Sequence, residues 1–268
     1  MDKNAPVSRL TSFPDGPLEL KLQVFLPLSE AEKSLLADLQ RTRVDCRPGV
    51  ELMREGEPIA KVMIVTEGWA IRHRDLSDGR RQIINFVLPG DFVGVQSLLF
   101  AQSDHSVSAL TKVKAAHFEP DRIIELFAQF PRLAAALSWC TTREESIIAE
   151  RVASIGRRSA YERMAHLFLE LLYRLRTVKS APGKSFKLPV TQEVLADVLG
   201  LSIVHVNRTL RRLRQEGLIE LDGGRIVIPD LAALEKTADF EKHFLHAGPP
   251  PRRVERQLEA LENGAVLT

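Results

Sequence analysis

The sequence predicts an α+β protein that carries antiparallel β-structure first, then a long helix, then a winged helix-turn-helix. Three features indicate this order. Short β-type runs separated by glycine turns occupy residues 44–120, a helical apolar stripe covers 132–155, and residues 189–229 combine two short helices with a strand pair. The chain has 268 residues, which is enough for two domains that each bury a core.

The first predicted element is a helix that begins near residue 30. Ser29 can cap its N-terminus, and Glu32, three positions later, completes the pattern of a capping box. Leu35, Leu36 and Leu39 give this helix an apolar face. Residues 1–30 carry no other firm periodic signal.

The β-type segment contains apolar runs at Val62–Val65, Trp69–Ile71 and Ile83–Val87. They lie at a spacing of roughly ten residues, which is typical of compact antiparallel β-structure. Glycine turns separate them, and Asp78-Gly79 is a favourable hairpin turn because both residues tolerate positive φ. We therefore predict a β-domain over residues 20–131.

The long helix is predicted over residues 132–156. A long helix with an apolar stripe after a β-domain often pairs with its twin, so we expect a dimerisation helix and a homodimer. Glu144 and Glu145 interrupt the stripe, which leaves packing on the chain's own domain as the alternative. A second helix, over about 159–177, has an apolar side that we expect to be core. The stripe of the long helix comprises Leu133, Leu137, Cys140, Ile147, Ile148, Val152 and Ile155.

Residues 157–236 are predicted to form a winged helix-turn-helix domain. Thr191 can cap the first helix of the motif, Gly200 can end it in the left-handed conformation, and Ser202 can cap the second helix. The result is a helix, a three-residue turn and a second helix, which is the order found in DNA-binding helix-turn-helix domains.

The second helix of this motif is expected to turn one face inward and to read DNA with the opposite face. In such motifs the N-terminal part of the helix meets base edges in the major groove, where arginine suits guanine and asparagine suits adenine. Val204 can offer only apolar contact, and Arg211, Arg212 and Arg214, further along, are expected to meet phosphates. At about 100° per residue, the inward positions are Val206, Leu210 and Leu213. The candidate DNA-binding residues are Thr191, Gln192, Ser202, Val204, His205, Asn207, Arg208, Arg211, Arg212 and Arg225.

A two-stranded wing is predicted after this helix, at Gly217–Leu221 and Arg225–Ile228, with Arg225 placed to touch the DNA backbone. Residues 151–225 carry 14 Lys/Arg and 7 Asp/Glu, a local charge of +7, whereas the remaining 23 basic and 28 acidic residues give −5. This asymmetry indicates a polyanion-binding half. On charge alone, a solvated, arginine-rich helical surface is an equal alternative.

The order of these elements resembles that of the CRP/FNR family of bacterial transcription regulators over residues 20–236. The resemblance implies an α+β fold with an N-terminal antiparallel β-roll of the cyclic-nucleotide-binding kind, a long dimerisation helix and a C-terminal winged helix-turn-helix. It also implies a homodimer on a palindromic operator, with double-stranded DNA, a second copy and RNA polymerase as partners. The stretches 151–175 and 201–214 look like a subgroup common in alphaproteobacteria. The β-roll markers are Gly49, Gly56, Thr66-Glu67-Gly68, Asp78-Gly79 and Leu88–Gly94.

The chain departs from the family pattern where cyclic nucleotides bind. Members that bind them carry Phe-Gly-Glu after a Pro-Gly-Asp turn, with the Glu on the ribose, and a later Arg-Ser pair that neutralises the phosphate. Here the first stretch reads Phe92-Val93-Gly94-Val95-Gln96, without a carboxylate, and the later pair reads His105-Ser106, without a permanent cation. Loss of a charged phosphate partner costs on the order of 2–5 kcal/mol, so we expect no tight binding of cyclic AMP. The candidate effector-pocket residues are Val93, Gly94, Val95, Gln96, Ser97, His105 and Ser106.

No cofactor and no metal site are predicted. An iron–sulfur cluster needs four thiolates, whereas the chain has only Cys46 and Cys140. Haem ligation by His73, His105 or His117 is an alternative, although a lone histidine is more often structural. Oxidation of Cys140 is another alternative, although buried cysteines usually behave as small hydrophobes.

The leading hypothesis is a sequence-specific DNA-binding regulator in the cytoplasm. The alternative is an effector-gated β-roll signalling module, responding to cyclic nucleotide, haem or redox state, whose DNA binding depends on the signal. No GxSxG, P-loop or HExxH motif appears, so an enzyme is not expected. No stretch approaches membrane-spanning length, so no membrane partner is expected either. Residues 237–268 are predicted as a C-terminal extension, mobile from 247 on, with a partial helix around 252–262.

Overall fold

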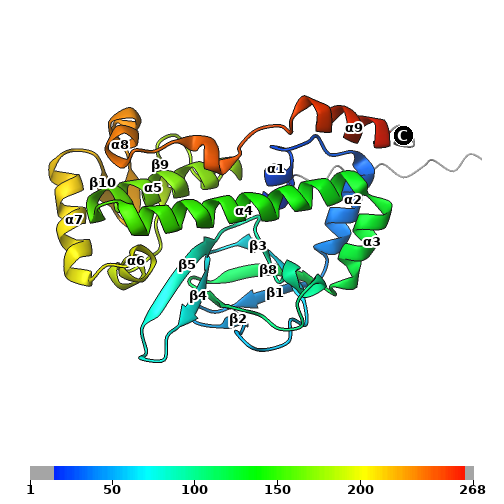
Figure 1. Ribbon diagram of the computed structural model, residues 1–268, viewed down its shortest axis with the longest axis horizontal. Helices are drawn as coiled ribbons and strands as arrows, with labels where there is room; N and C mark the ends of the chain where they lie inside the picture. Colours follow the sequence, from blue (N-terminus) through cyan, green and yellow to red (C-terminus); the bar gives the residue numbers. More distant parts are fainter. Residues whose placement is uncertain (1–14, 263–268) are drawn as a thin grey trace, which may run out of the picture.

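A computed structural model describes residues 15–262 of the chain. A β-roll forms the N-terminal half, and the long helix α4 (Pro131–Arg157) runs across the molecule above it (Figure 1). One end of α4 lies beside the N-terminal helices, and the other end reaches the winged domain. The predicted order of β-structure, long helix and winged helix-turn-helix is therefore confirmed.

The β-roll consists of two antiparallel four-stranded sheets whose facing sides bury one apolar core. The predicted hairpin at Asp78-Gly79 joins β4 to β5, and Gly79 has the positive φ that such a turn requires. One sheet has the order β1 (Arg43–Cys46), β8 (Val113–Phe118), β3 (Val62–Glu67) and β6 (Phe92–Val93). The other has the order β2 (Glu51–Met53), β7 (Ser106–Ala109), β4 (Ala70–Asp75) and β5 (Arg81–Val87).

Three short helices cover the outer side of the first sheet: α1 (Pro17–Leu22), α2 (Glu30–Leu39) and α3 (Asp121–Gln129). The capping box predicted for α2 is present, because Ser29 accepts from the Glu32 backbone while the Glu32 carboxylate accepts from Ser29 N–H. α1 was not predicted, because it has only six residues; burial of Leu18 and Leu22 holds it in place.

The two ends of the apolar stripe of α4 differ in burial. Leu133, Leu137 and Cys140 pack on the chain's own N-terminal helices, as the alternative interpretation of the stripe had it. Towards the C-terminal end Val152 is 66% exposed, with Ile148 and Ile155 half-buried on the same side. The following helix, α5 (Ala160–Thr177), begins at a capping box on Ser159 and buries its predicted stripe except for Ala160, which is half-buried.

The winged domain contains α6 (Gln192–Leu199), α7 (Ile203–Gln215), the wing strands β10 (Glu220–Asp222) and β11 (Arg225–Val227), and the helix α8 (Leu231–Ala238). The wing sheet has a third strand, β9 (Ser185–Lys187), beside β11, so the prediction of a two-stranded wing was incomplete. β9 has only three residues, too few to show the alternation of apolar and polar positions that predicts a strand. α8 was also not predicted; Asp230 caps it by accepting from Ala233 N–H.

The C-terminal extension packs against α4. It forms a 3-10 turn, η2 (Lys242–Leu245), and then the helix α9 (Arg252–Glu262), which confirms the predicted helix. Leu258 of α9 is buried in the core that α4 shares with α1 to α3, and Arg143 of α4 donates to the Leu245 carbonyl. Residues 247–262 are therefore docked, which corrects the prediction of a mobile tail there; residues 263–268 lie outside the described residues.

The β-roll and the winged domain share an apolar core. Trp69 and Phe86 of the second sheet belong to the same buried cluster as the inward sides of α5, α6 and α7. Arg81 on β5 forms an ion pair with Asp197 on α6 at 2.7 Å, which ties the two parts at the surface. No helix within residues 15–262 is long and apolar enough to cross a membrane.

Candidate nucleic-acid interface and sensor pocket

The helix-turn-helix is set by local capping. Thr191 accepts from Val194 N–H at the start of α6, and Gly200 ends that helix with φ of 63°. Ser202 then caps α7 by accepting from His205 N–H. Each of these three predicted roles is confirmed, and together they fix the turn that aims α7 away from the protein body.

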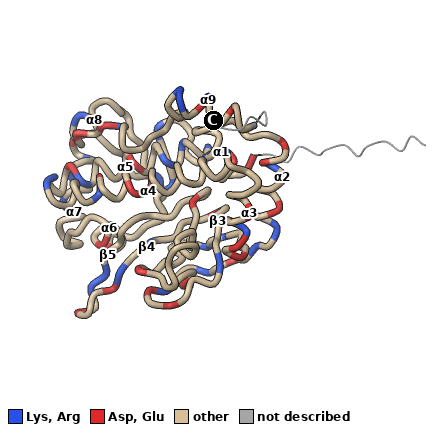
Figure 2. The backbone as a smooth tube through the Cα atoms, turned by 45° about the vertical axis from the view of Figure 1, so that its right-hand side comes forward, with Lys and Arg blue, Asp and Glu red and all other residues tan. Residues whose placement is uncertain are grey.

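α7 separates its two faces as the sequence indicated. Val206, Leu210 and Leu213 are buried in the domain core, together with Thr209, which the periodicity did not place there. On the opposite face Val204 is 75% exposed, and basic positions follow along the helix, as Figure 2 shows at α7. The predicted outward residues His205, Asn207, Arg208, Arg211 and Arg212 are all exposed.

Three arginines of α7 are available for an external anion. Within residues 15–262, no carboxylate lies within ion-pair distance of Arg208, Arg211 or Arg214. Arg211 and Arg214 line a hollow of about 470 Å³ between α7 and the wing strand β10. A polyanion that enters there can bind these two charges without first breaking an ion pair within the described residues.

Arg212 differs from its neighbours. Its Nε lies 2.7 Å from Glu216 Oε1, and its guanidinium lies 4.2 Å from the centre of the Tyr161 ring. Tyr161 also donates to Glu216, and burial together with this carboxylate raises the pKa of Tyr161 to about 12. Arg212 therefore joins α7 to α5, a role that the prediction of a phosphate contact did not include.

The remaining predicted DNA-binding residues flank α7. Thr191 and Gln192 are exposed at the N-terminus of α6, and Ser202 is exposed at the N-terminus of α7. Arg225 lies on the wing strand β11 and donates to Ser185 Oγ at 3.1 Å. This partner is neutral, so the full charge of Arg225 remains available at the wing.

The predicted effector-pocket residues lie around β6, the 3-10 turn η1 (Val95–Leu98) and β7. Gly94 has φ of 85°, and a Cβ there would lie 2.6 Å from the Lys61 carbonyl oxygen, so the tight turn requires glycine. Val93 is buried in the β-roll core, and Ser106 accepts from Glu55 N–H. Val95, Gln96 and Ser97 are half-buried on η1, where the Gln96 amide contacts Met53 Sδ at 3.7 Å.

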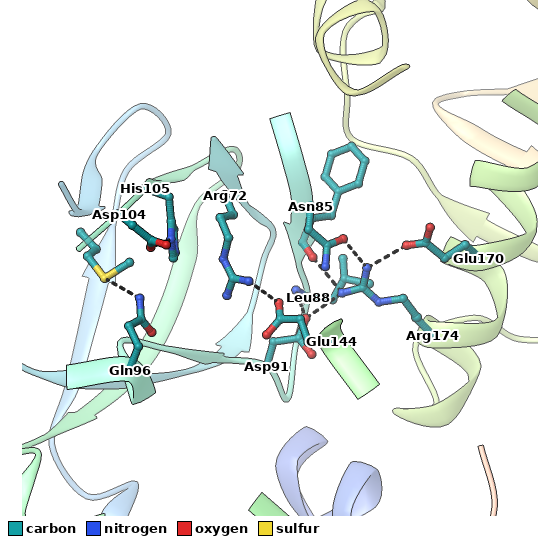
Figure 3. Close-up of polar contacts among 12 residues, drawn as sticks. Arg72, Asn85, Leu88, Asp91, Gln96, Asp104, His105, Glu144, Glu170 and Arg174 are labelled. Atoms are coloured by element: carbon teal, nitrogen blue, oxygen red, sulfur yellow. Dashed lines mark hydrogen bonds and ion pairs between the residues drawn. The ribbon is translucent and has the colours of Figure 1, made fainter. Parts of the chain in front are cut away.

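An ion pair of the chain itself joins this part of the β-roll to α4. Arg72 on β4 lies 2.9 Å from Glu144 on α4, and Gln96 and His105 lie on the β-roll side of that pair (Figure 3). His105 Nδ1 lies 2.6 Å from Asp104, but burial and the nearby Arg72 lower the pKa of His105. The imidazole is therefore neutral near pH 7. Glu144, which the sequence only marked as an interruption of the stripe, thus has a partner.

Three residues considered for alternative sensors, His73, Cys46 and Cys140, are buried. His73 is buried with Nε2 2.9 Å from Ser108 Oγ, and no group of three or more His, Cys, Asp and Glu residues within 15–262 could hold a metal ion. Cys46 and Cys140 are both buried, and burial raises the pKa of each thiol. Because the thiolate is the reactive form, neither cysteine is primed for oxidation.

Comparisons with known proteins agree with this architecture. The sequence profile of the cyclic nucleotide-binding domain matches residues 43–130, and that of the Crp-like helix-turn-helix domain matches residues 162–237. The nitrogen fixation regulation protein FixK of Bradyrhizobium diazoefficiens is 32% identical over 196 residues, which cover 73% of this chain and 81% of FixK. The chain belongs to the CRP/FNR family of transcription regulators.

Other relatives of this CRP/FNR regulator are similar over the same region. The transcriptional activatory protein AadR of Rhodopseudomonas palustris is 34% identical, over 68% of this chain and 76% of AadR. The solved structure of FixK2 from Bradyrhizobium japonicum superposes with a TM-score of 0.67 at 28% identity, over 73% of this chain and 96% of FixK2. The winged helix-turn-helix is thus the DNA-binding part of a transcription regulator.

The CRP/FNR chain also contains a buried polar network that sequence reasoning missed. Arg174 on α5 lies 2.9 Å from Asp91, in the turn after β5, and donates to Asn85 and to the Phe86 carbonyl (Figure 3). Glu170 lies 3.0 Å from the same guanidinium. Asp91 belongs to the Leu88–Gly94 turn, which is one of the β-roll markers in the sequence. No local sequence pattern indicates that its partner lies 83 positions later.

Proposed function

We propose that the protein binds a palindromic operator as a homodimer, reads bases with the N-terminal half of α7, and acts on promoters together with RNA polymerase in the cytoplasm. The observation that carries this proposal is the exposed face of α7, on which three arginines lack ion pairs among the described residues. Val204, Asn207 and Arg208 are the base-reading residues, and Arg211, Arg214 and Arg225 meet the phosphate backbone.

The exposed end of α4 supports the homodimer. Ile148, Val152 and Ile155 lie on one side of the helix at the spacing of a coiled-coil seam, and Val152 is 66% exposed. A second α4 on this side relates two α7 helices by a two-fold axis. Two-fold symmetry then demands half-sites about one DNA turn, or about 34 Å, apart.

The β-roll is proposed not to take cyclic AMP. The stretch Phe92–Gln96 contains no carboxylate and position 105 holds a histidine, whereas cyclic-nucleotide-binding members carry a Glu and an Arg there, and His105 is neutral. The nearby cation, Arg72, is already paired with Glu144. A cyclic phosphate would have to displace that carboxylate, so the residues present do not fit the nucleotide.

The test is binding to DNA by the full chain. Sequences bound from a random pool are selected first, and fluorescence anisotropy then measures affinity for the selected duplex and for a scrambled one at several salt concentrations. We expect a palindromic consensus, a two-to-one ratio of chains to duplex, and an affinity that falls steeply with salt. Absence of binding at low salt, or equal affinity for both duplexes, contradicts the proposal.

A further inference from the structure

A groove of about 1110 Å³ lies between α4 and the C-terminal extension. Ala135, Ser138, Trp139 and Thr142 of α4 form one wall, and the extension, which passes over α4 from α8 to α9 in Figure 1, forms the other. The groove shares no residue with the reading face of α7 or with the candidate effector pocket. Its size is that of a small-molecule site.

The outer wall is built by residues that follow the matched winged domain. The match to the Crp-like helix-turn-helix ends at residue 237, whereas η2 and the proline-rich turn Pro249–Pro251 come after it. Apart from Glu235 and Lys236, the lining residues lie outside both matched domains, so the groove depends on this chain's extension.

The floor of the groove is aromatic. Trp139 on α4 stacks on Phe25 with ring centres 5.5 Å apart, and Phe240, at the end of α8, lines the opposite side. Aromatic faces of this kind favour a flat ring over a flexible chain, because stacked rings gain contact area at little cost in conformational freedom.

Arg143 is a buried cation at this floor, and it has no ion-pair partner among the described residues. Its side chain lies over the Trp139 ring, the residue is 5% exposed, and Nε donates to the Leu245 carbonyl. Within residues 15–262, no carboxylate lies within ion-pair distance of Arg143, and neither Nη atom has an acceptor. Burial lowers the pKa of Arg143, and the more distant Asp91 and Glu170 oppose this effect. A guanidinium keeps its proton, so a positive charge without an ion-pair partner among the described residues is held at the groove.

The other ionisable groups of the lining lie at the partly or fully exposed rim. Lys242 lies 3.1 Å from Glu235, and His243 lies 3.6 Å from Glu241. Lys236 and Asp239 are both exposed and of opposite charge. Arg143 is the buried cation of the lining.

A second copy of the chain does not supply the missing anion. Arg143 precedes Val152 by nine residues, which at about 100° per residue places it on the opposite side of α4. A dimer that pairs through Val152 leaves the groove open and Arg143 unpaired.

We propose that this groove binds a small aromatic carboxylate, whose oxygens accept hydrogen bonds from Arg143 and whose ring packs on the Trp139 side of the floor. The ligand bridges α4 to the C-terminal extension. Its carboxylate provides Arg143 with a negatively charged partner, and its flat ring covers the aromatic floor. Binding at this site requires neither DNA nor a ligand in the β-roll.

The test is calorimetry on the full chain with naphthoate as the probe. Naphthalenemethanol has the same ring without the charge, and cyclohexanecarboxylate has the charge without the flat ring. We expect one naphthoate per chain and affinities weaker by about tenfold or more for the alcohol, since a buried charged pair is lost. No naphthoate binding by the folded chain overturns the proposal.

Variants locate the site. Arg143→Gln should weaken naphthoate binding by about tenfold or more, and Ala135→Phe, which fills the groove and keeps the arginine, should weaken it as well. Lys61→Glu, a charge reversal on the β-roll surface away from the groove, should leave the affinity unchanged. Unaltered binding in both groove variants overturns the proposal.

A measurement on the unaltered chain does not depend on how the variants fold. Naphthoate should slow amide hydrogen exchange in the segment 240–254, which forms the outer wall, because the ligand holds that wall to α4. Protection confined to the β-roll or to α7 would place the ligand elsewhere and overturn the proposal.

Discussion

The guanidinium of Arg174 and the carboxylate of Asp91 lie 2.9 Å apart in the interior, where they join α5 to the turn after β5. Lys21 of α1 lies 2.6 Å from the other oxygen of Asp91, so one carboxylate receives two cations from distant parts of the chain. These cations hold the pKa of Asp91 well below its usual range against the effect of burial. The contact fixes how the β-roll sits on the helix that leads into the winged domain.

Arg174→Met should reduce the free energy of unfolding by about 3–5 kcal/mol, because it leaves a buried carboxylate short of a partner. Urea unfolding at neutral pH measures the change. The matched control is Arg211→Met, which removes an exposed and unpaired arginine and should alter stability by less than about 0.5 kcal/mol. Equal stability of the two variants would show that the buried pair contributes nothing net.

His166 on α5 should make the fold less stable at mildly acidic pH. The ring is buried against Phe240 and Phe244, and burial lowers its pKa from 6.5 to about 4, although Glu170 and Glu150 favour the charged form. Between these two pH values the unfolded chain binds a proton that the folded chain refuses. Stability is therefore complete above about pH 6.5 and falls as the pH drops towards 4.

His166→Phe tests this dependence, since it keeps an aromatic ring and removes the titrating group. Thermal melts from pH 7 to pH 4 should fall less steeply for the variant than for the unaltered chain. His243→Phe is the control, because that side chain is 91% exposed and should not change the profile. A profile for His166→Phe parallel to the original contradicts the assignment.

Arg208 and Arg211 should affect DNA binding differently. Arg208→Ala should cost about 1–3 kcal/mol on the selected operator and relax preference at one base pair, as expected for a base contact. Arg211→Ala should weaken specific and random DNA alike and reduce the salt slope by about 1, as expected for a phosphate contact. Anisotropy titrations on both duplexes separate the two results.

Arg212→Ala is the internal comparison for these variants. Its charge is already paired with Glu216 and its guanidinium packs on Tyr161, so the salt slope should change less than for Arg211→Ala. An equal change in slope would mean that DNA draws Arg212 away from Glu216.

Cyclic AMP should neither bind tightly nor alter DNA affinity. Arg72, a cation beside the candidate pocket, is held by Glu144, and the neutral His105 cannot replace a permanent charge at the phosphate. Calorimetry with the full chain should show no micromolar binding. A micromolar dissociation constant would refute the interpretation of Gln96 and His105 as departures from the cyclic-nucleotide-binding pattern.

The elements predictable from the sequence are those whose cause is local. Thr191, Gly200 and Ser202 act on neighbours within a few positions, so capping rules placed α6 and α7 correctly. The alternation of buried and exposed positions in α7 follows from helical periodicity alone. The candidate reading face could therefore be defined before any tertiary contact was known.

The features that the sequence did not reveal depend on contacts between distant segments. The pairing of Arg174 with Asp91 and that of Arg72 with Glu144 join residues more than 70 positions apart, and neither pair lies in a periodic pattern. Arg212 has the composition of a phosphate-binding residue, yet a tyrosine 51 positions earlier engages it. The docking of α9 on α4 likewise depends on burial of Leu258 against residues from the opposite end of the chain.

Val152→Glu should convert the homodimer to a monomer. Val152 is an apolar residue that is 66% exposed, and a carboxylate there would face its own copy across a two-fold axis, where like charges repel. Sedimentation should show a single chain, and operator affinity should fall by about a hundredfold or more, because two half-sites no longer bind as one unit. Leu99→Glu, which changes an 83% exposed leucine on the β-roll, should leave both properties unchanged. A dimeric Val152→Glu protein with full operator affinity would mean that α4 pairs through another face, or that the dimer forms elsewhere.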